Sequence, residues 1–359
     1  MMNPSPHLVV SISGHGFGHV AQTAPILNRM HQIMPTLRMT VRSSVPLEHL
    51  RTRIRAPFEH LCSSGDIGMA MSSAVEINVE KTRAAYREFH ANWDARVKEE
   101  GALLLELKAD MVFSNVGYLA LAGAQQAGIT NAALCSLNWS DIYRHCCGND
   151  EITSQIQSCY AGTDAFLRAT PGMEMSDLAQ RVPVAPIAEI GTNRRDELFA
   201  HLKLSTQEKL VLISMGGISS RLPIDDWLRI EGVRYLVQDQ VRHPDAFSFK
   251  NLPFTFNELI SSCDVMLCKP GYGSFVEAAC SGVPVLYVTR PDWPESPALI
   301  AWLQQHGVCR EISNDAYQQG SIADELKSVW AQTAPTKVIP NGAHQVADWL
   351  FEKLSRSGD

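Results

Sequence analysis

The sequence lacks any apolar run near the roughly 20 residues that a membrane-spanning helix needs. Its N-terminus, MMNPSPHLVVSISG, has no basic region of the signal-peptide kind, and its short apolar run breaks at Gly14. The nine cysteines form no CxxC pair, which in a chain of 359 residues favours reduced thiols over a disulfide framework. We therefore expect a cytoplasmic protein without a transmembrane segment, whereas peripheral membrane contact and oligomeric state stay open.

The sequence also lacks an Asp-x-Asp pair and a Gly-Lys-Ser/Thr phosphate loop. A divalent metal held between paired aspartates is therefore not expected. The group His145, Cys146 and Cys147 has no second pair of ligands nearby, so we predict neither a metal nor a cofactor. The net charge of −7 argues against a nucleic-acid partner.

The composition is that of a globular protein, with 45 % hydrophobic and 19 % charged residues. The length fits two domains better than one. We place an N-terminal domain at 1–182 and a second at 183–340, with a proline-containing linker over 181–191. The amphipathic stretch 341–359 is expected to be a helix that packs back on the first domain.

Buried strands and helices alternate along both halves of the chain. In the first half, strands are predicted at 7–12, 109–115 and 129–137, and one long charged helix at 84–108. In the second half, strands are predicted at 209–214 and 283–289. This order is typical of right-handed crossovers, and it predicts an α/β fold with two Rossmann-like parallel-sheet domains that face a central cleft.

A glycine turn follows a predicted strand in the segment CDVMLCKPGYGSFVEAACSGVP (263–284). Gly271 and Gly273 let the backbone approach a phosphate, and a helix is expected to begin near Ser274 and to end at Gly282. The amides and the dipole at such a helix start form an anion site. Glu277 lies beside that site, where a carboxylate would bind a ribose diol. An ordinary crossover capped by Ser274 would give the same pattern.

The first glycine turn, SGHGFGHVAQ (13–22), places His19 near a helix start. The dipole disfavours imidazolium there, so the ring should stay neutral and able to accept a proton. The alternative is that His15 or His19 caps the helix. A third turn, MGGISS (215–220), offers Gly216 and Gly217 for backbone contact with a ligand, or is an ordinary turn.

The chain resembles the GT-B glycosyltransferases across almost its whole length. The resemblance rests on the first glycine turn and on SSGDIGM, SLNWSDIY, CKPGYGSFVEAACSGVP and RPDWPESPALIAWL. It is strongest to the glycosyltransferase-like N-terminal region of plant L-arabinokinase and its stand-alone bacterial relatives. It is weaker to the peptidoglycan N-acetylglucosaminyltransferase and the UDP-glycosyltransferases.

The resemblance implies a metal-independent hexosyl- or N-acetylhexosaminyl-transferase with a UDP-sugar donor and a small-molecule or glycan acceptor. His19 would be the base, oriented by Asp66 or Asp141, and Gly16, Gly18 and Asn138 would contact the acceptor. The residues implied at the donor are Arg195, Gly216, Gly217, Phe254, Gly271, Tyr272, Gly273, Ser274, Glu277, Asp292 and Glu295. The Asp-Gln pair that usually contacts the sugar is missing, which leaves the sugar open.

The resemblance also addresses stereochemistry and rival functions. Many retaining members carry two glutamates separated by seven residues, and here the first position is Lys269. This departure favours inversion by direct displacement. Two alternatives share the expected fold, namely a UDP-sugar 2-epimerase and a nucleotide-sugar-binding regulatory module without catalysis.

Overall fold

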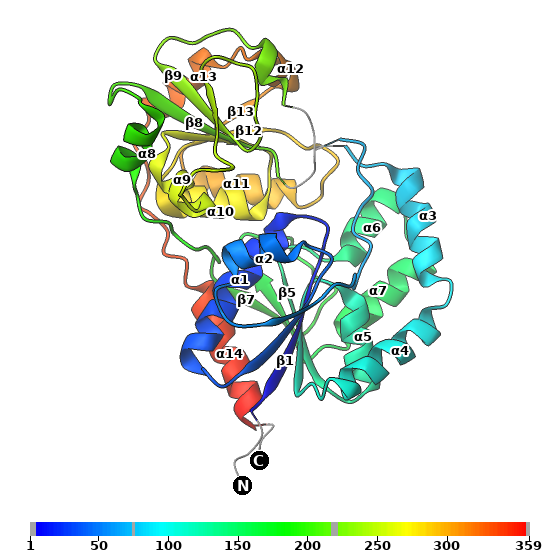
Figure 1. Ribbon diagram of the computed structural model, residues 1–359. Coiled ribbons are helices and arrows are strands. Elements are labelled where there is room, and N and C mark those ends of the chain that lie inside the picture. Colours follow the sequence, from blue (N-terminus) through cyan, green and yellow to red (C-terminus); the bar gives the residue numbers. More distant parts are fainter. Residues whose placement is uncertain (1–4, 74–75, 217–221, 357–359) are drawn as a thin grey trace. The chain divides into compact units, whose positions relative to one another are not determined.

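The computed structural model describes residues 5–73, 76–216 and 222–356, which form two compact units (Figure 1). Unit 1 comprises Met1–Ser72, Ile77–Ile187 and Asn341–Asp359, and unit 2 comprises Ser73–Glu76 and Ala188–Pro340. Each unit is built on one parallel β-sheet with helices packed against it. The predicted class, α/β with two Rossmann-like parallel-sheet domains, is confirmed.

The sheet of unit 1 has the strand order β3-β2-β1-β4-β5-β6-β7. Its strands are β1 (His7–Ile12), β2 (Arg38–Arg42), β3 (Glu59–Leu61), β4 (Met111–Asn115), β5 (Thr130–Cys135), β6 (Ala165–Ala169) and β7 (Arg181–Val184). Every residue of the central strands β1 and β4 is buried, as expected for strands covered by helices on both faces. Because all pairings are parallel, the loops after β1, β4 and β5 leave the same edge of the sheet.

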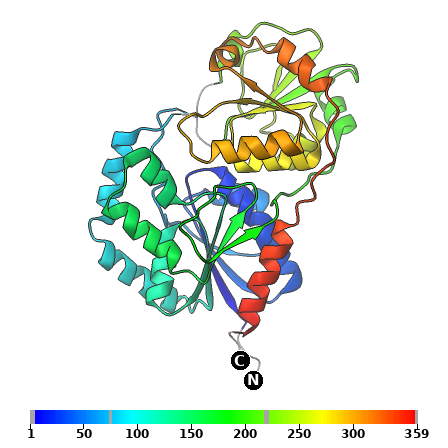
Figure 2. The ribbon, with the colours of Figure 1, turned by 180° about the vertical axis from the view of Figure 1, so that it is seen from behind.

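The helices of unit 1 lie on both faces of this sheet, as Figures 1 and 2 show from opposite sides. They are α1 (Phe17–Ile33), α2 (Leu47–Arg53), α3 (Val79–His90), α4 (Trp93–Glu106), α5 (Tyr118–Gln126), α6 (Trp139–Cys147), α7 (Glu151–Ala161) and α14 (Gly342–Arg356). The C-terminal helix α14 packs beside α1, with Val346, Leu350 and Leu354 buried.

The sheet of unit 2 has the order β10-β9-β8-β11-β12-β13 and is also parallel. Its strands are β8 (Lys209–Ser214), β9 (Val233–Val237), β10 (Ala246–Ser248), β11 (Val265–Cys268), β12 (Val285–Val288) and β13 (Cys309–Ile312). Its helices are α8 (Arg195–Leu202), α9 (Phe256–Ser262), α10 (Tyr272–Ser281), α11 (Ser296–His306), α12 (Asn314–Gln319) and α13 (Ala323–Trp330), with a 3-10 turn at Pro223–Asp226.

The predicted linker at 181–191 is partly wrong. Residues Arg181–Val184 form β7, which pairs with β6, and the chain enters unit 2 only at Ala188. Pro183 suggested a linker, but β7 is the edge strand of its sheet, where a residue without an N–H is tolerated. The prediction failed because proline marks sheet edges as well as linkers.

The predicted helix at 84–108 is in fact two helices. α3 begins at Val79, where the side chain of Asn78 accepts a hydrogen bond from the Lys81 amide. It ends at His90, and α4 starts after Asn92. The charged pattern runs through the break, so periodicity alone did not reveal it.

Candidate functional site

The polar residues of unit 1 that follow β1, β4 and β5 gather at the carboxyl edge of its sheet. Ser13 follows β1, Asn115 ends β4, and Ser136 follows β5. All three side chains are at most 1 % exposed. Such an edge is where ligands bind in open parallel sheets, so this cluster is the candidate site of unit 1.

His19 is the third residue of α1 and is 7 % exposed. Its Nδ1 lies 2.8 Å from Oδ1 of Asn115. Because an amide oxygen only accepts, Nδ1 carries the ring proton and Nε2 keeps a lone pair. Burial lowers the pKa of His19, against the opposing effect of the Asn115 hydrogen bond. The ring is therefore a neutral imidazole in the tautomer that a general base needs.

The amide of Asn115 is oriented by a short hydrogen-bond chain. Its Nδ2 donates to Oε1 of Gln22 over 3.0 Å, and Nε2 of Gln22 donates to Oγ of Ser136 over 2.8 Å. These hydrogen bonds engage Nδ2 of Asn115, so its Oδ1 is the atom that accepts from His19. Sequence reasoning missed Asn115 and Gln22, although a polar residue at the end of the apolar run ADMVFSN was a usable signal.

Asp66 lies in the loop after β3 and is 3 % exposed. Its carboxylate accepts from Oγ of Ser13 at 3.0 Å and from Nε1 of Trp139 at 2.8 Å. Burial raises the pKa of Asp66 to about 6, although both hydrogen bonds oppose the shift. These contacts fix Trp139, whose ring lies edge-on to His15 with centroids 5.1 Å apart.

The prediction that Asp66 or Asp141 orients His19 is wrong, because Asn115 holds that position. Asp66 is bound by Ser13 and Trp139 instead. Asp141 lies in the first turn of α6, 3.4 Å from the guanidinium of Arg144, and burial raises its pKa. A buried carboxylate can be satisfied by neutral donors, which sequence spacing does not reveal.

Asn138 was expected at the acceptor, but it is the N-cap of α6. Its Oδ1 accepts from the Asp141 amide and its Nδ2 donates to Oδ2 of Asp141, both at 2.8 Å. Each amide group thereby has one hydrogen bond within α6, and the contact of Asn138 with an acceptor stays a prediction. Ser, Asn and Asp before an apolar run predict capping as readily as binding.

The glycines of the first turn adjoin open space. Among the described residues, no atom outside the local turn lies within 4 Å of an ideal Cβ at Gly16 or Gly18. Gly16 is the N-cap of α1 without a side-chain hydrogen bond. The N-terminal amides of α1 therefore adjoin space that a ligand could enter beside His19.

In unit 2, α10 starts two residues earlier than the sequence suggested. Tyr272 is its first residue, Gly271 is the N-cap, and there is no side-chain cap, so the capping role of Ser274 is wrong. The first helical bond runs from the Phe275 amide to the Gly271 carbonyl, which leaves the amides of Tyr272, Gly273 and Ser274 outside the helical ladder. The helix ends at Gly282 with φ 76°, as predicted.

Gly216, after β8, has φ +85°, a conformation that favours glycine. Gly217 lies outside the described residues. Beside Gly216 stands the side chain of Lys269, whose Cε is 3.1 Å from an ideal Cβ at that glycine. Burial, and then the charge of Arg290, lower the pKa of Lys269 to about 7. Sequence reasoning assigned neither cation to a ligand, although each closely follows a predicted strand.

Glu277 lies on α10 and is 2 % exposed. Its Oε1 accepts from Nδ2 of Asn257 at 3.1 Å. The same amide group donates to the carbonyl of Glu189, in the segment that enters unit 2. Glu277 therefore joins α10 to α9, and this hydrogen bond orients its carboxylate.

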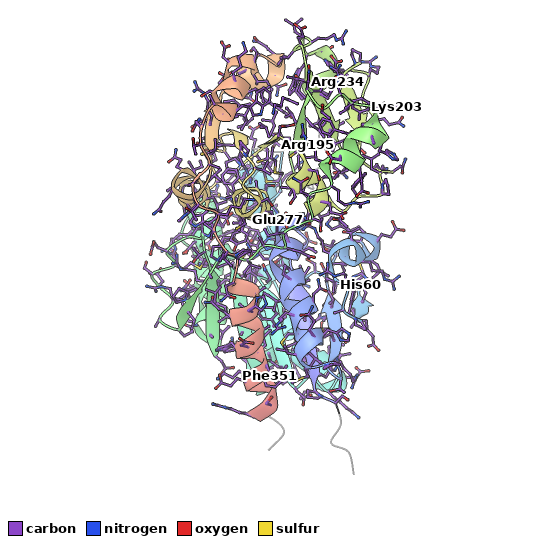
Figure 3. The ribbon with its side chains drawn as sticks, turned by 90° about the vertical axis from the view of Figure 1, so that its left-hand side faces the viewer. His60, Arg195, Lys203, Arg234, Glu277 and Phe351 are labelled. Carbon is purple, nitrogen blue, oxygen red and sulfur yellow. The ribbon has the colours of Figure 1, made fainter. Side chains whose placement is uncertain are left out.

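The predicted contact of Arg195 with diphosphate is wrong. Its guanidinium donates to Oδ2 of Asp264 at 2.7 Å and to the carbonyl of Glu208 at 3.1 Å. These residues precede β11 and β8, so Arg195 lies at the amino edge of the sheet. The helix start of α10 is at the carboxyl edge, about 15–20 Å away for strands of this length. Figure 3 shows Arg195 and Glu277 well apart.

Three other residues predicted at the donor, Phe254, Asp292 and Glu295, differ in their contacts and exposure. The ring of Phe254 is covered by the guanidinium of Arg194, 4.5 Å from its centroid. Asp292 is exposed. Glu295 is 4 % exposed and accepts from Nε1 of Trp293 at 3.0 Å. Of the three, Asp292 is the most accessible to a sugar hydroxyl.

The described residues contain neither a candidate membrane span nor a candidate metal cluster. Over the described parts of the chain, no helix is long and apolar enough to cross a membrane. No group of three or more His, Cys, Asp or Glu side chains within those same parts could hold a metal ion.

Comparisons with known proteins point to one fold. No family model matches the chain. L-arabinokinase of Arabidopsis thaliana is 25 % identical over 307 residues, which cover 82 % of this chain but only 29 % of that protein. The chain thus spans less than a third of the curated relative that it matches.

Two solved structures cover nearly the whole chain. The calicheamicin glycosyltransferase CalG4 aligns with a TM-score of 0.61 and 13 % identity, over 98 % of this chain and 99 % of that one. The UDP-GlcNAc 2-epimerase from Methanocaldococcus jannaschii aligns with a TM-score of 0.57 and 10 % identity, over 97 % and 99 %. The chain therefore has the GT-B fold and is a distant homologue of part of L-arabinokinase.

Proposed function

We propose that the chain is a glycosyltransferase that moves a sugar from a nucleotide-diphosphate donor, a UDP-sugar by default, to a small-molecule or glycan acceptor. The observation that carries the proposal is His19. It is buried, neutral, held through Nδ1 by Asn115, and next to a glycine turn with open space. A base in this state suits proton removal from an acceptor.

In the proposed mechanism the donor binds unit 2, with its phosphates at the amides that open α10 and at Gly216. Glu277 binds the ribose. His19 removes the acceptor's proton through Nε2 while the acceptor oxygen attacks the anomeric carbon. The bond from the anomeric carbon to the phosphate oxygen breaks on the opposite face, so the configuration inverts. The leaving diphosphate needs no metal, because backbone amides and cationic side chains stabilise its negative charge.

Two further findings support this reading. The carboxylate of Glu277 is held by Asn257, which favours a positioned ribose contact. The names of the compared proteins, a glycosyltransferase and a UDP-GlcNAc 2-epimerase, agree with nucleotide-sugar chemistry on this fold. Kinase activity is not proposed, because the match covers only 29 % of L-arabinokinase.

A two-stage experiment tests the proposal. A thermal-shift screen of nucleoside diphosphates and their sugars finds the donor, since a ligand of the folded state raises its apparent stability. The donor is then incubated with an acceptor library, and nucleotide release is measured. His19→Ala should reduce turnover by a factor of about 10²–10⁴. His31→Ala, on the last turn of the same helix, is the matched control and should not.

The outcomes separate the rival functions. An epimer formed from the nucleotide-sugar alone would identify a 2-epimerase and overturn the transfer mechanism. Binding without turnover across the library would leave a nucleotide-sugar-binding module. Glu277→Gln should weaken nucleotide affinity about tenfold or more in calorimetry, and unchanged affinity would remove Glu277 from the ribose site.

A further inference from the structure

A cavity of about 550 Å³ opens among the helices α4, α5 and α7 of unit 1. Of these helices, α5 contacts both of the others (Figure 1). On α5, Ala120 and Ala124 pack toward the sheet, whereas Ala122, which lines the cavity, lies about 200° around the helix from each of them. The cavity therefore faces away from the sheet and is separate from the edge that holds His19. Its volume is within the range of about 300–1,000 Å³ that is usual for a small-molecule site.

Trp93, the first residue of α4, is a partly exposed member of the cavity wall and is held in place from behind. Its ring stacks on that of His90, with the centroids 4.8 Å apart and an interplanar angle of 15°. His90 is itself fixed, because its Nδ1 lies 2.8 Å from Oε1 of Gln155 and its Nε2 lies 3.0 Å from the hydroxyl of Tyr118. The indole is thus a rigid, flat apolar surface, which reduces the entropy lost when a ligand packs on it.

Most of the other lining side chains are polar. Gln155 is oriented through its oxygen by the same histidine, and Gln125 donates from Nε2 to the carbonyl of Cys159 at 2.7 Å. Each amide nitrogen carries two protons, so both glutamines keep a donor for a ligand. Asp94 and Glu151 add two exposed carboxylates. Among the described residues that line the cavity, none is a lysine or an arginine.

This lining discriminates between classes of ligand. A phosphate or an acidic ligand would meet Asp94 and Glu151 without a cation in the described lining to offset the repulsion. A lipid chain would cover the amides and carboxylates without pairing them. A sugar ring satisfies both kinds of surface, because its C–H face can lie on an indole while its hydroxyls donate to carboxylates and pair with amides.

We propose that this cavity is a saccharide-binding site, in which a neutral oligosaccharide packs one ring on Trp93 and pairs its hydroxyls with the surrounding amides and carboxylates. The inference goes beyond the proposed function, and the binding does not depend on it. In a glycosyltransferase, a glycan held on unit 1 would also raise the effective concentration of an acceptor chain on the enzyme.

Calorimetry with neutral tetrasaccharides tests the inference on the whole chain. Cellotetraose, maltotetraose, chitotetraose and mannotetraose are the probes, and at least one should bind with a dissociation constant of about 1 mM or below. Tetralysine is titrated as the alternative occupant, because Asp94 and Glu151 would attract a cationic chain.

Three variants locate the binding. Trp93→Ala removes the flat surface and should weaken tetrasaccharide binding about tenfold or more. Ser154→Phe places a ring in the cavity from an exposed position on α7, where the serine hydroxyl donates to the carbonyl of Asp150 in the same helix turn, and it should weaken binding as much. Ser355→Phe, the same change at an exposed serine of α14, is the matched control and should bind as the wild type does.

Each result supports or overturns the inference. Binding in the wild type and in Ser355→Phe that is lost in Ser154→Phe and Trp93→Ala supports it, and if Trp93→Ala does not fold, the two phenylalanine variants decide alone. Equal affinity in all the folded proteins overturns it, because the sugar would then bind elsewhere. Failure of every tetrasaccharide to bind also overturns it, and binding of tetralysine alone, lost in Ser154→Phe, would assign the cavity to a cationic partner. These failures leave the proposed function standing, because the cavity is separate from His19.

Discussion

Replacing Lys269 by methionine should stabilise the protein. The methionine keeps the length of the side chain and removes an ammonium that burial and Arg290 both disfavour. A residue kept for stability would behave in the opposite way. A gain in stability would therefore show that Lys269 is not kept for its contribution to folding.

The size of this stabilisation and its dependence on pH follow from the linkage between proton binding and folding. The pKa of Lys269 falls from 10.5 to about 7 on folding. Between pH 7 and pH 10.5 the lysine is protonated in the unfolded chain and neutral in the folded one, so the wild type gains stability as the pH rises. Below about pH 7 the folded protein carries the full free-energy cost of burying the charged lysine. At 1.36 kcal/mol per pKa unit the penalty has an upper bound near 5 kcal/mol, and relaxation of the site reduces it to about 2–5 kcal/mol.

Urea unfolding of unit 2 measures the effect. At pH 6, Lys269→Met should raise the free energy of unfolding by about 2–5 kcal/mol, and the gain should shrink toward zero as the pH approaches 10.5. Lys327→Met, at an exposed lysine, should change it by less than about 0.5 kcal/mol at either pH. A loss of stability in Lys269→Met at pH 6 would refute the reasoning, because it would show that the contacts of the lysine outweigh the cost of burying its charge.

Three further predictions concern other residues of the two units. Asn115→Leu removes the acceptor for Nδ1 of His19 and should lower turnover about 10²-fold with unchanged nucleotide affinity, measured by steady-state kinetics and calorimetry; equal losses in both would contradict a positioning role. Asp66→Asn should stabilise unit 1 by about 1–3 kcal/mol above pH 6 and not at pH 4, because the raised pKa of this carboxyl penalises its ionised form; denaturation at both pH values decides. Arg195→Met should lower the melting temperature and leave nucleotide affinity unchanged, and weakened affinity in a variant that stays folded would restore Arg195 to the donor site.

The sequence predicted the strands and the glycine turns well because both depend on local patterns. The apolar runs of β1, β4 and β8 are buried as the patterns indicated. Gly282 ends α10 in the left-handed conformation that glycine permits. Such features need only a few neighbouring residues, so a single sequence contains them.

Pairing between distant residues was not predictable in the same way. The partner of His19 is Asn115, 96 positions away, and neither spacing nor charge distinguishes it from Asp66. Arg195 fitted a diphosphate contact by its place after the linker, yet its ion pair with Asp264 puts it at the opposite edge of the sheet. The cations that do lie beside α10, Lys269 and Arg290, come together only because β11 and β12 are neighbours.

Hydrogen–deuterium exchange tests most directly the claim that the carboxyl edge of unit 2 holds the nucleotide. The protein is compared with and without a saturating nucleoside diphosphate found by the thermal-shift screen. The account predicts slower exchange at Gly216 and over Tyr272–Phe275, where the amides at the start of α10 would bind phosphate, and no change over Arg195–Leu202. Protection over Arg195–Leu202 with none at the start of α10 would contradict it.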